Sequence, residues 1–406
     1  MVTIQRAREL AWEKARPLRG REEIPLTSSI DRILAEDIRA RFDIPPFDRA
    51  AMDGYALRAT DTAGSSAKRT TAIKVVDELK AGDSGGAYAG RGEAVSIMTG
   101  ARMPSSCDSV IMMEKTREYS EGGERFIRVP GPVTPGDNVG KKGEDLKKGH
   151  IVLKRGRLID SSVLGMLSYL GRERVNVYRK PAVAILATGN EIIRPGAKIK
   201  EGGIYDANSY LLYGQVLRAS GKPRLLGIGR DDYAKLSAKI MKGLKYDMLI
   251  LSGGVSVGKY DIVVDVLKKA GVEMIFWKVA VKPGKPTFFG KKGKTLVFGL
   301  PGYPVSTFLN FDNIVKVALA RMAGRNAPEK FMLPAVLREN VKSKGDRDSF
   351  IRMNLIFEGD EYFTAPYGRQ KSGVLTSVIE SQGVLHLKKG ESFKKGEKVM
   401  VELLEK

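Results

Sequence analysis

Two glycine-bearing segments each follow an apolar run and have the composition of anion-binding loops. They read SGGVSVGKYD (252–261) and GLPGYPVS (299–306). Glycines let the backbone approach a ligand closely, and the N–H groups of a helix that starts there point outward. A single segment could be an ordinary strand-to-helix turn, but two on one sheet favour a phosphate-type ligand. We assign this binding to Gly253, Gly254, Ser256, Gly299, Pro301 and Gly302.

A basic segment, AVKPGKPTFFGKKGK (280–294), lies between these loops and holds five lysines and no acid. Lys282 and Lys285 each precede a proline, which limits backbone freedom and could present both ammonium groups to a phosphate. The remaining lysines are typical of a solvent-exposed turn, and they are Lys291, Lys292 and Lys294.

Acidic residues near the same loops would repel a phosphate unless a divalent cation lay between them. Mg²⁺ prefers oxygen ligands and keeps several waters, so one or two carboxylates plus the phosphate suffice. The candidates are Glu191, Asp206 and Asp261. Structural roles are equally open, because Asp261 could cap the helix after it and Asp206 could form an Asx turn.

The elements that would carry these residues form a parallel α/β pattern. Three buried strands end in glycine-bearing loops, with helical stretches between them: AVAILATG (182–189), DMLILSGG (247–254) and TLVFGLPG (295–302). Pro304 opens a long helix that ends at Gly324. Ligands of open sheets bind at the carboxyl ends of the strands, where all three loops lie.

The flanking sequence predicts helical and β regions. Helical spacing is expected near the N-terminus and again over TSSIDRILAEDI (27–38), and DSSVLGMLSYLG (160–171) reads as a helix capped by Asp160 or Ser161. After the paired prolines of DIPPF, short alternating runs up to about Gly143 indicate an inserted β domain. Short strands beyond Pro328 indicate a small C-terminal β domain.

Composition narrows the partner classes. The 406 residues allow two to four domains, and the net charge of +22 favours anionic partners. A basic nucleic-acid-binding protein stays an alternative, although aromatic residues make up only 7% and do not interleave with basic clusters. One cysteine, Cys107, and two histidines leave few ligands for zinc. Without a secretory leader or a long apolar run, the expected location is the cytoplasm, with no membrane contact.

Seven spaced segments occur in a familiar order: AMDGYA, TGARMP followed by Asp108 and Glu114, KKGEDL, ATGNEI, SGGVSVG, KPGKP and GLPGYPVS. Together they cover essentially the whole chain. In this order they resemble the molybdopterin molybdenumtransferases, the family of MoeA and the gephyrin E-domain.

The resemblance implies a multidomain α/β protein with four parts. These are a helical and extended linker region (1–42 plus 144–179), an inserted β lid domain (43–143), a central parallel-sheet α/β domain that binds molybdopterin nucleotide (180–327) and a small C-terminal β-barrel domain (328–406). The family works as a homodimer, and its cleft lies between the sheet domain of one subunit and the lid of the other.

The resemblance also implies an activity: insertion of molybdate into adenylylated molybdopterin, with Mg²⁺-dependent release of AMP, to give molybdenum cofactor. A tungstate-inserting version is the alternative, because the two oxyanions have equal charge and nearly equal size. The molybdopterin adenylyltransferase that supplies the substrate is an expected partner, and no specific nucleic acid is.

Site residues carry over by position. Asp53, Thr99, Asp145, Glu191, Asp206 and Asp261 resemble the family's catalytic residues, and Asp206 and Asp261 its Mg²⁺-associated acids. Lys282 and Lys285 resemble its phosphate-facing lysines. The residues that resemble its molybdate site are Lys285, Pro286, Arg352 and Ser372. The sequence departs from the family's motifs at three places: Gly140 with two lysines stands in place of an arginine run, Asn190 in place of aspartate, and Tyr303 in place of asparagine.

Overall fold

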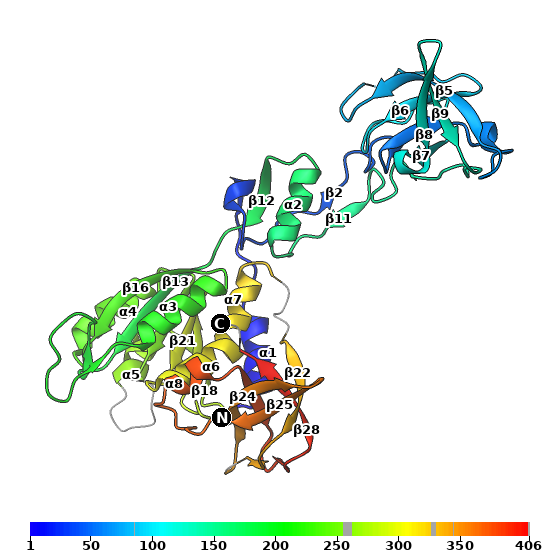
Figure 1. Ribbon diagram of the computed structural model, residues 1–406. Helices are drawn as coiled ribbons and strands as arrows, with labels where there is room; N and C mark the ends of the chain where they lie inside the picture. The colour runs from blue at the N-terminus through cyan, green and yellow to red at the C-terminus, as the bar shows by residue number, and fades with distance from the viewer. Residues whose placement is uncertain (85, 255–261, 326–329, 344, 405–406) are drawn as a thin grey trace. The chain divides into compact units, whose positions relative to one another are not determined.

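The computed structural model describes residues 1–84, 86–254, 262–325, 330–343 and 345–404, and these form two compact units (Figure 1). The core unit consists of Met1–Glu36 and Arg155–Lys406, and the inserted unit consists of Asp37–Lys154. Each unit has its own hydrophobic core.

The core unit is built on a six-stranded mixed sheet. Its strands, in sheet order, are β16 (Lys222–Gly229), β13 (Ala182–Thr188), β17 (Met248–Ser252), β21 (Thr295–Leu300), β20 (Phe288–Lys292) and β18 (Glu273–Trp277). The first four run parallel, as the three buried runs predicted, whereas β20 is antiparallel to both of its neighbours, β21 and β18. Lys291 and Lys292 are therefore strand residues, which corrects their assignment to an exposed turn.

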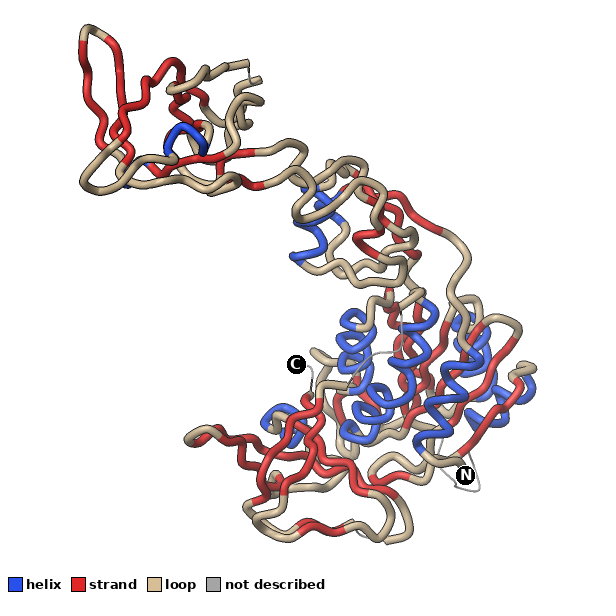
Figure 2. The backbone as a smooth tube through the Cα atoms, turned by 90° about the vertical axis from the view of Figure 1, so that its right-hand side faces the viewer, coloured by secondary structure: helices blue, strands red, loops and turns tan. Residues whose placement is uncertain are grey.

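Alternating side chains of the parallel strands enter two cores, one on each face of the sheet. Ile185 lies in one core and Leu186 in the other. One face is covered by α1 (Ile4–Lys14), α3 (Asn208–Arg218), α6 (Pro304–Asn310), a π-helical segment (Phe311–Val315) and α7 (Lys316–Met322). The other face is covered by α4 (Tyr233–Gly243) and α5 (Ile262–Lys269). Figure 2 shows these helices on the two sides of the strands. The predicted long helix is confirmed, since α6, the π-helical segment and α7 are continuous.

A small layer of the core unit pairs β1 (Arg21–Pro25) with β12 (Arg174–Tyr178), next to α2 (Ser161–Tyr169), whose N-cap is Asp160 as predicted. The expected helix over 27–38 is wrong. Only a short 3-10 turn (Leu26–Ser28) forms, and Ile33 and Leu34 then make β-bridges to Leu158 and Val177. Tertiary β pairing at this buried surface outweighs the helical spacing of the apolar residues.

The C-terminal part closes into a five-stranded barrel. The ring consists of β24 (Asp348–Glu358), β25 (Glu361–Pro366), β22 (Met332–Leu337), β28 (Lys398–Leu403) and β26 (Gly383–Leu387), which pairs back with β24. A two-residue strand, β19 (Val281–Lys282), adds to β24. The remaining elements are β23 (Val341–Lys342), β27 (Ser392–Phe393) and α8 (Thr376–Glu380).

The inserted unit contains the predicted β domain, a six-stranded sheet. Its order is β7 (Ser109–Met112), β4 (Gly54–Leu57), β6 (Glu93–Ile97), β5 (Thr71–Leu79), β9 (Glu124–Val129) and β8 (Arg117–Glu121). Two 3-10 turns, Ala59–Thr62 and Met113–Lys115, flank it. Two short ladders complete the unit: β2 (Ile38–Arg39) with β11 (Ile151–Leu153), and β3 (Arg49–Ala50) with β10 (Val139–Gly140).

Candidate active site

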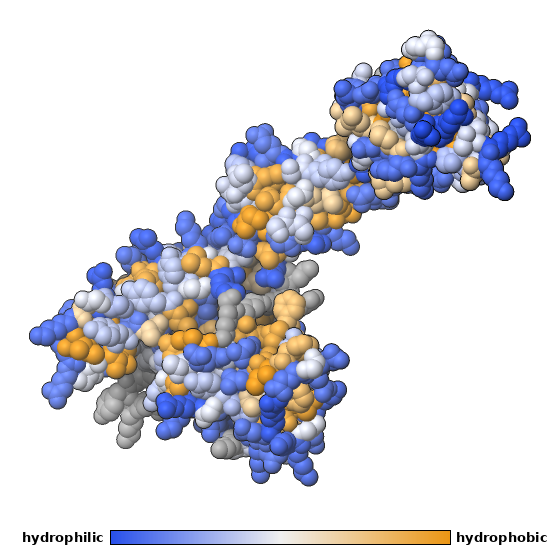
Figure 3. All heavy atoms as spheres, viewed as in Figure 1, coloured by the Kyte–Doolittle hydropathy of each residue, from blue (hydrophilic) through white to orange (hydrophobic). Residues whose placement is uncertain are grey.

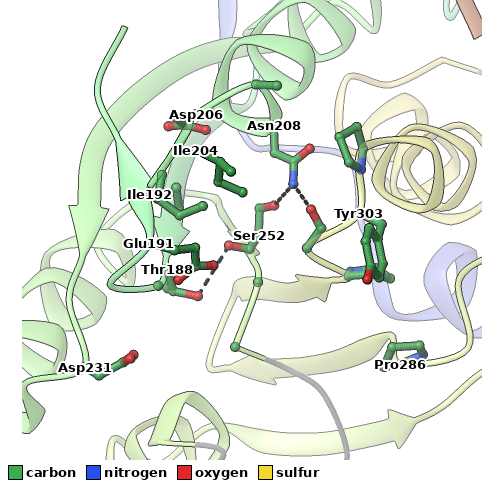
Figure 4. A pocket seen from close by; sticks show the side chains of 18 of the residues that line it. Thr188, Glu191, Ile192, Ile204, Asp206, Asn208, Asp231, Ser252, Pro286 and Tyr303 are labelled. Atoms are coloured by element: carbon green, nitrogen blue, oxygen red, sulfur yellow. Dashed lines mark hydrogen bonds between the residues drawn. The ribbon is translucent and has the colours of Figure 1, made fainter. Parts of the chain in front are cut away.

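A cleft of about 1230 Å³ lies at the carboxyl ends of β13, β17 and β21, where the sequence placed the ligand site. One side carries acids and the short parallel pair β14 (Ile192–Ile193) and β15 (Ile204–Tyr205). Pro286 and Tyr303 lie on the opposite side (Figure 4). Among the described residues that line the cleft, every charged side chain is acidic: Glu191, Asp206, Asp231 and Asp265.

The glycines of the first loop are required by close packing. Gly253 has φ +88°, and a Cβ there would lie 2.6 Å from the carbonyl oxygen of Thr188. Gly254 has φ +61°, and its Cβ would lie 2.5 Å from Val263 Cγ2. Any side chain at either position would meet neighbouring atoms, so the backbone itself lines the cleft here.

Pro301 and Gly302 of the second loop also line the cleft, as predicted. Gly299 does not, because it lies within β21, paired with Leu251 and Phe288. The predicted residues Ser256 and Asp261 lie outside the described residues.

Asn208 joins the two loops and was not predicted as a site residue. Its Nδ2 donates to Ser252 Oγ at 2.8 Å and to the carbonyl oxygen of Gly302 at 2.7 Å (Figure 4). Its Oδ1 is buried and has no hydrogen-bond partner in the described part of the chain. The sequence signal was available, since Asn208 directly follows the IYDA segment, but it indicated only a helix start.

The acidic side contains two predicted residues. Asp206 is only 7% exposed, and its Oδ1 accepts a hydrogen bond from Ser209 N–H at 2.9 Å, in the first turn of α3; the structural alternative for this residue was a local Asx turn. The Glu191 carboxylate is exposed and lies against Gly189. Asp231 and Asp265 also line the cleft and were missed.

These acids fit a loosely held Mg²⁺ better than a dedicated metal cage. Among the described residues, no group of three or more Asp, Glu, His or Cys side chains is arranged to hold a metal ion. One or two carboxylates with phosphate and water oxygens are nevertheless a sufficient ligand set for Mg²⁺. Asp206 would be one such carboxylate, since the hydrogen bond from Ser209 occupies only one of its two oxygens.

The two predicted lysines do not line this cleft. Lys282 is exposed on β19, and Lys285 is half-buried, whereas their neighbour Pro286 does line it. Val279 N–H donates to the carbonyl oxygen of Lys285, and so does Thr287 N–H, both at 2.9 Å. Lys285 is thus held in a tightly bonded loop at the cleft margin.

Arg352 is a buried cation without an ion-pair partner among the described residues. It is 1% exposed, and burial lowers its pKa to about 10. Its guanidinium donates to Ser377 Oγ at 3.2 Å and to the carbonyl oxygens of Phe350 and Lys371, both at 3.4 Å. These contacts are long, so the charge is poorly compensated.

The segment after Lys371 extends to the cleft. The carbonyl oxygen of Ser372 accepts a hydrogen bond from Val305 N–H at 3.2 Å, and Gly373 lines the cleft beside Tyr303. Of the predicted pair, Ser372 thus lies in a loop that contacts the start of α6, whereas Arg352 lies on β24 and reaches that loop through the carbonyl oxygen of Lys371; neither residue lines the cleft itself.

In the inserted unit, the structure brings Asp53 and Thr99 together. Asp53 Oδ1 accepts hydrogen bonds from Thr99 N–H at 2.6 Å and from Thr99 Oγ1 at 2.8 Å. These two bonds hold the pKa of Asp53 below its usual range. Asp145 is exposed, and its N–H donates to the carbonyl oxygen of Ile44.

The departures have local structural counterparts. After Gly140, Lys141 forms an ion pair with Asp48, and Lys142 one with Asp43. In the core unit, Asn190 Oδ1 accepts from Asp231 N–H at 3.1 Å, so it orders a cleft acid instead of adding a charge. Tyr303 caps α6 and is 63% exposed.

Comparisons with known proteins cover nearly the whole chain. Three family models match it: the MoeA N-terminal region (domains I and II) over residues 2–171, a probable molybdopterin binding domain over 184–321, and the MoeA C-terminal region (domain IV) over 334–404. No helix within the described ranges is long and apolar enough to cross a bilayer.

Two relatives and one solved structure agree with these matches. The molybdopterin molybdenumtransferase of Bacillus subtilis (strain 168) is 33% identical, over 94% of this chain and 90% of that protein. That of Staphylococcus aureus (strain Mu50) is 32% identical, over 94% and 91%. The crystal structure of the molybdopterin biosynthesis MoeA protein from Pyrococcus horikoshii OT3 has a TM-score of 0.85 and 33% identity, with both chains fully covered. The chain therefore belongs to the molybdopterin molybdenumtransferase family, of which MoeA is a member.

Proposed function

We propose that the protein inserts molybdate into adenylylated molybdopterin and releases AMP, a step of molybdenum cofactor biosynthesis. The observation that carries the proposal is the two-sided cleft, with backbone loops at its base. Acids lie on one side. On the other side, Gly373 lies beside Tyr303 and belongs to the loop whose Lys371 carbonyl oxygen accepts a hydrogen bond from the buried Arg352. A substrate with a phosphate at one end and an oxyanion acceptor at the other needs such an arrangement.

The backbone loops suit the phosphates, because Gly254 and Gly302 line the cleft without side chains, whereas Gly253 N–H already donates to the carbonyl oxygen of Leu300. Asp206, together with Asp261, would hold Mg²⁺, which supplies positive charge for the phosphate oxygens when bound. Arg352 offers a poorly compensated positive charge that suits a tetrahedral oxyanion.

Two further parts of the proposal come from the family. We propose a homodimer in which the Asp53 and Thr99 pair of one copy serves the cleft of the second copy. We also propose that the protein acts in the cytoplasm and receives its substrate from a molybdopterin adenylyltransferase. Chromatography with light scattering, with and without that enzyme, tests the homodimer and the complex with the adenylyltransferase.

Local charge supports this proposal more than the net charge of +22 does. On the face shown in Figure 3, hydrophilic residues are spread over both units. The alternative nucleic-acid function predicts salt-sensitive gel shifts with random DNA or RNA.

The test is turnover with adenylylated molybdopterin, molybdate and Mg²⁺, with AMP measured by chromatography. AMP release that requires all three components supports the proposal, and AMP release at the same rate without molybdate contradicts it. Competition between molybdate and tungstate, followed by elemental analysis of the product, decides which oxyanion is inserted.

A further inference from the structure

The segment Val281–Thr287, here called the KPGKP loop, is held from behind by one buried residue. Asn310, the last residue of α6, is fully buried. Its Nδ2 donates to the carbonyl oxygen of Gly284 at 2.8 Å and to Thr287 Oγ1 at 2.5 Å. Thr287 Oγ1 in turn donates to the same Gly284 oxygen at 2.8 Å. These three groups form a polar cluster between α6 and the loop, in which Asn310 Oδ1 is buried without a hydrogen-bond partner among the described residues.

The Asn310 amide lies against the Cα of Gly284. Gly284 has φ +113°, and a Cβ there would stand 2.5 Å from both Nδ2 and Oδ1 of Asn310. The glycine is therefore required twice, by its backbone conformation and by the amide packed on it. The Asn310 side chain can therefore occupy this position only if residue 284 of the loop is a glycine.

The same helix fixes two other parts of the cleft margin. Tyr303 and Pro304, at the start of α6, line the cleft, and Val305 N–H holds the carbonyl oxygen of Ser372. Pro286, which the Asn310 cluster flanks, lines the cleft on the side where Tyr303 lies (Figure 4). One rigid helix therefore sets the mutual position of three loops.

We infer that Asn310 is a positioning residue for the oxyanion end of the cleft, acting through the KPGKP loop on Lys285 and Pro286. The inference rests on the proposed function for what the loop binds, but not for how the loop is held. Asn310 need not touch the substrate, because its effect passes through hydrogen bonds to Gly284 and Thr287.

The test compares Asn310→Leu with Asn313→Leu. Leucine at 310 keeps the side-chain size and removes both hydrogen bonds to the loop. Asn313 is the matched control, since it is buried on the same continuous helix but donates to the carbonyl oxygen of Leu309 and accepts from Lys330. Hydrogen exchange of the peptide spanning 278–287 should become about tenfold faster in Asn310→Leu only.

Turnover is the second measurement. Asn310→Leu should raise the KM for molybdate about tenfold while the dissociation constant for AMP stays unchanged. Unchanged exchange would overturn the positioning role. Faster exchange with an unchanged KM for molybdate would overturn the link to the oxyanion. If the wild type releases no AMP, the proposed function fails, and the exchange result still decides how the loop is held.

A second pair of variants, at Gly284 and Asn310, keeps the inference testable if Asn310→Leu does not fold. Gly284→Ala should disorder the loop, because its new Cβ would meet the Asn310 amide. The double variant Gly284→Ala with Asn310→Ala gives that Cβ room, so its loop exchange should be slower than in Gly284→Ala alone. Equal exchange in the two variants would contradict direct packing of Asn310 on the loop.

Discussion

Replacing Arg352 should change the stability of the protein and its activity in opposite directions. Burial lowers the pKa of its guanidinium to about 10, well below the usual value of arginine, and this change corresponds to roughly 3 kcal/mol of desolvation cost. The charge is present at neutral pH in the folded and unfolded chains alike, so this cost applies at every pH below about 10. Arg352→Met removes the cost.

The three hydrogen bonds of Arg352 offset part of that gain. Two of them are 3.4 Å long, and a typical bond contributes about 1 kcal/mol or less at such lengths. Without any oxyanion, Arg352→Met should therefore be more stable than the wild type by about 1–2 kcal/mol. In the same variant, AMP release at moderate molybdate concentration should be nearly lost.

Molybdate should reverse the order of stability. At a hundred times its dissociation constant, a ligand of the native state stabilises by about 2.7 kcal/mol, which only the wild type should gain. Thermal and urea unfolding with and without molybdate measure both effects. Arg321→Met is the control, because Arg321 stacks on Trp12, with the guanidinium carbon 4.5 Å from the ring centroid, and should lose stability in either condition. The reasoning is refuted if Arg352→Met is destabilised without oxyanion, or is stabilised by molybdate as much as the wild type.

Three other predictions concern the remaining site residues. Asp206→Asn keeps an acceptor for the α3 N-terminus, so helix content should stay unchanged while Mg²⁺-dependent AMP release falls about a hundredfold; retained activity would leave Asp206 only its contact with Ser209. Gly253→Ala should lower the free energy of unfolding by at least about 1 kcal/mol, because its Cβ would meet Thr188, and an unchanged urea midpoint would speak against that contact. Thr99→Val removes one of the two hydrogen bonds to Asp53. Because the pKa of Asp53 is lower in the folded than in the unfolded chain, this carboxylate stabilises the fold at pH values above its unfolded pKa, and the stabilisation is lost as the pH falls through its folded pKa. In Thr99→Val the pKa of Asp53, measured by NMR, should therefore rise, and acid unfolding should start at a higher pH.

Sequence patterns located the cleft because the signals were local and repeated. The buried runs that end at Thr188 and Ser252 identified parallel strands, and their glycine loops marked one sheet edge. Antiparallel β18 and β20 were missed because their residues alternate less clearly and sit among lysines and glycines. The false helix over 27–38 had good apolar spacing, and only the partners of Ile33 and Leu34, more than a hundred residues away, decide its structure.

Asn208 and Asn310 show why part of the site could not be predicted. Each lies in or next to a helix, where asparagine has no particular signal. Their roles depend on Ser252, Gly302, Gly284 and Thr287, which only the folded chain brings within hydrogen-bond distance. Asp206 shows the reverse case, since its contact with Ser209 is local, and a local Asx turn was foreseen as an alternative.

The chain leaves the core unit after Glu36 and re-enters it at Arg155, and in each unit the two chain ends at this point are paired with each other. Inside the inserted unit, Ile38 and Leu153 are paired neighbours, so its two ends lie side by side. Inside the core unit, Leu34 N–H donates to the carbonyl oxygen of Arg157 at 2.9 Å, and Gly156 N–H donates to that of Leu34 at 2.7 Å. In each unit, the two chain segments at the point of insertion are therefore held together by their own backbone pairing. We expect that joining Glu36 directly to Arg155 would leave the core unit folded, because these hydrogen bonds already hold its two chain ends together.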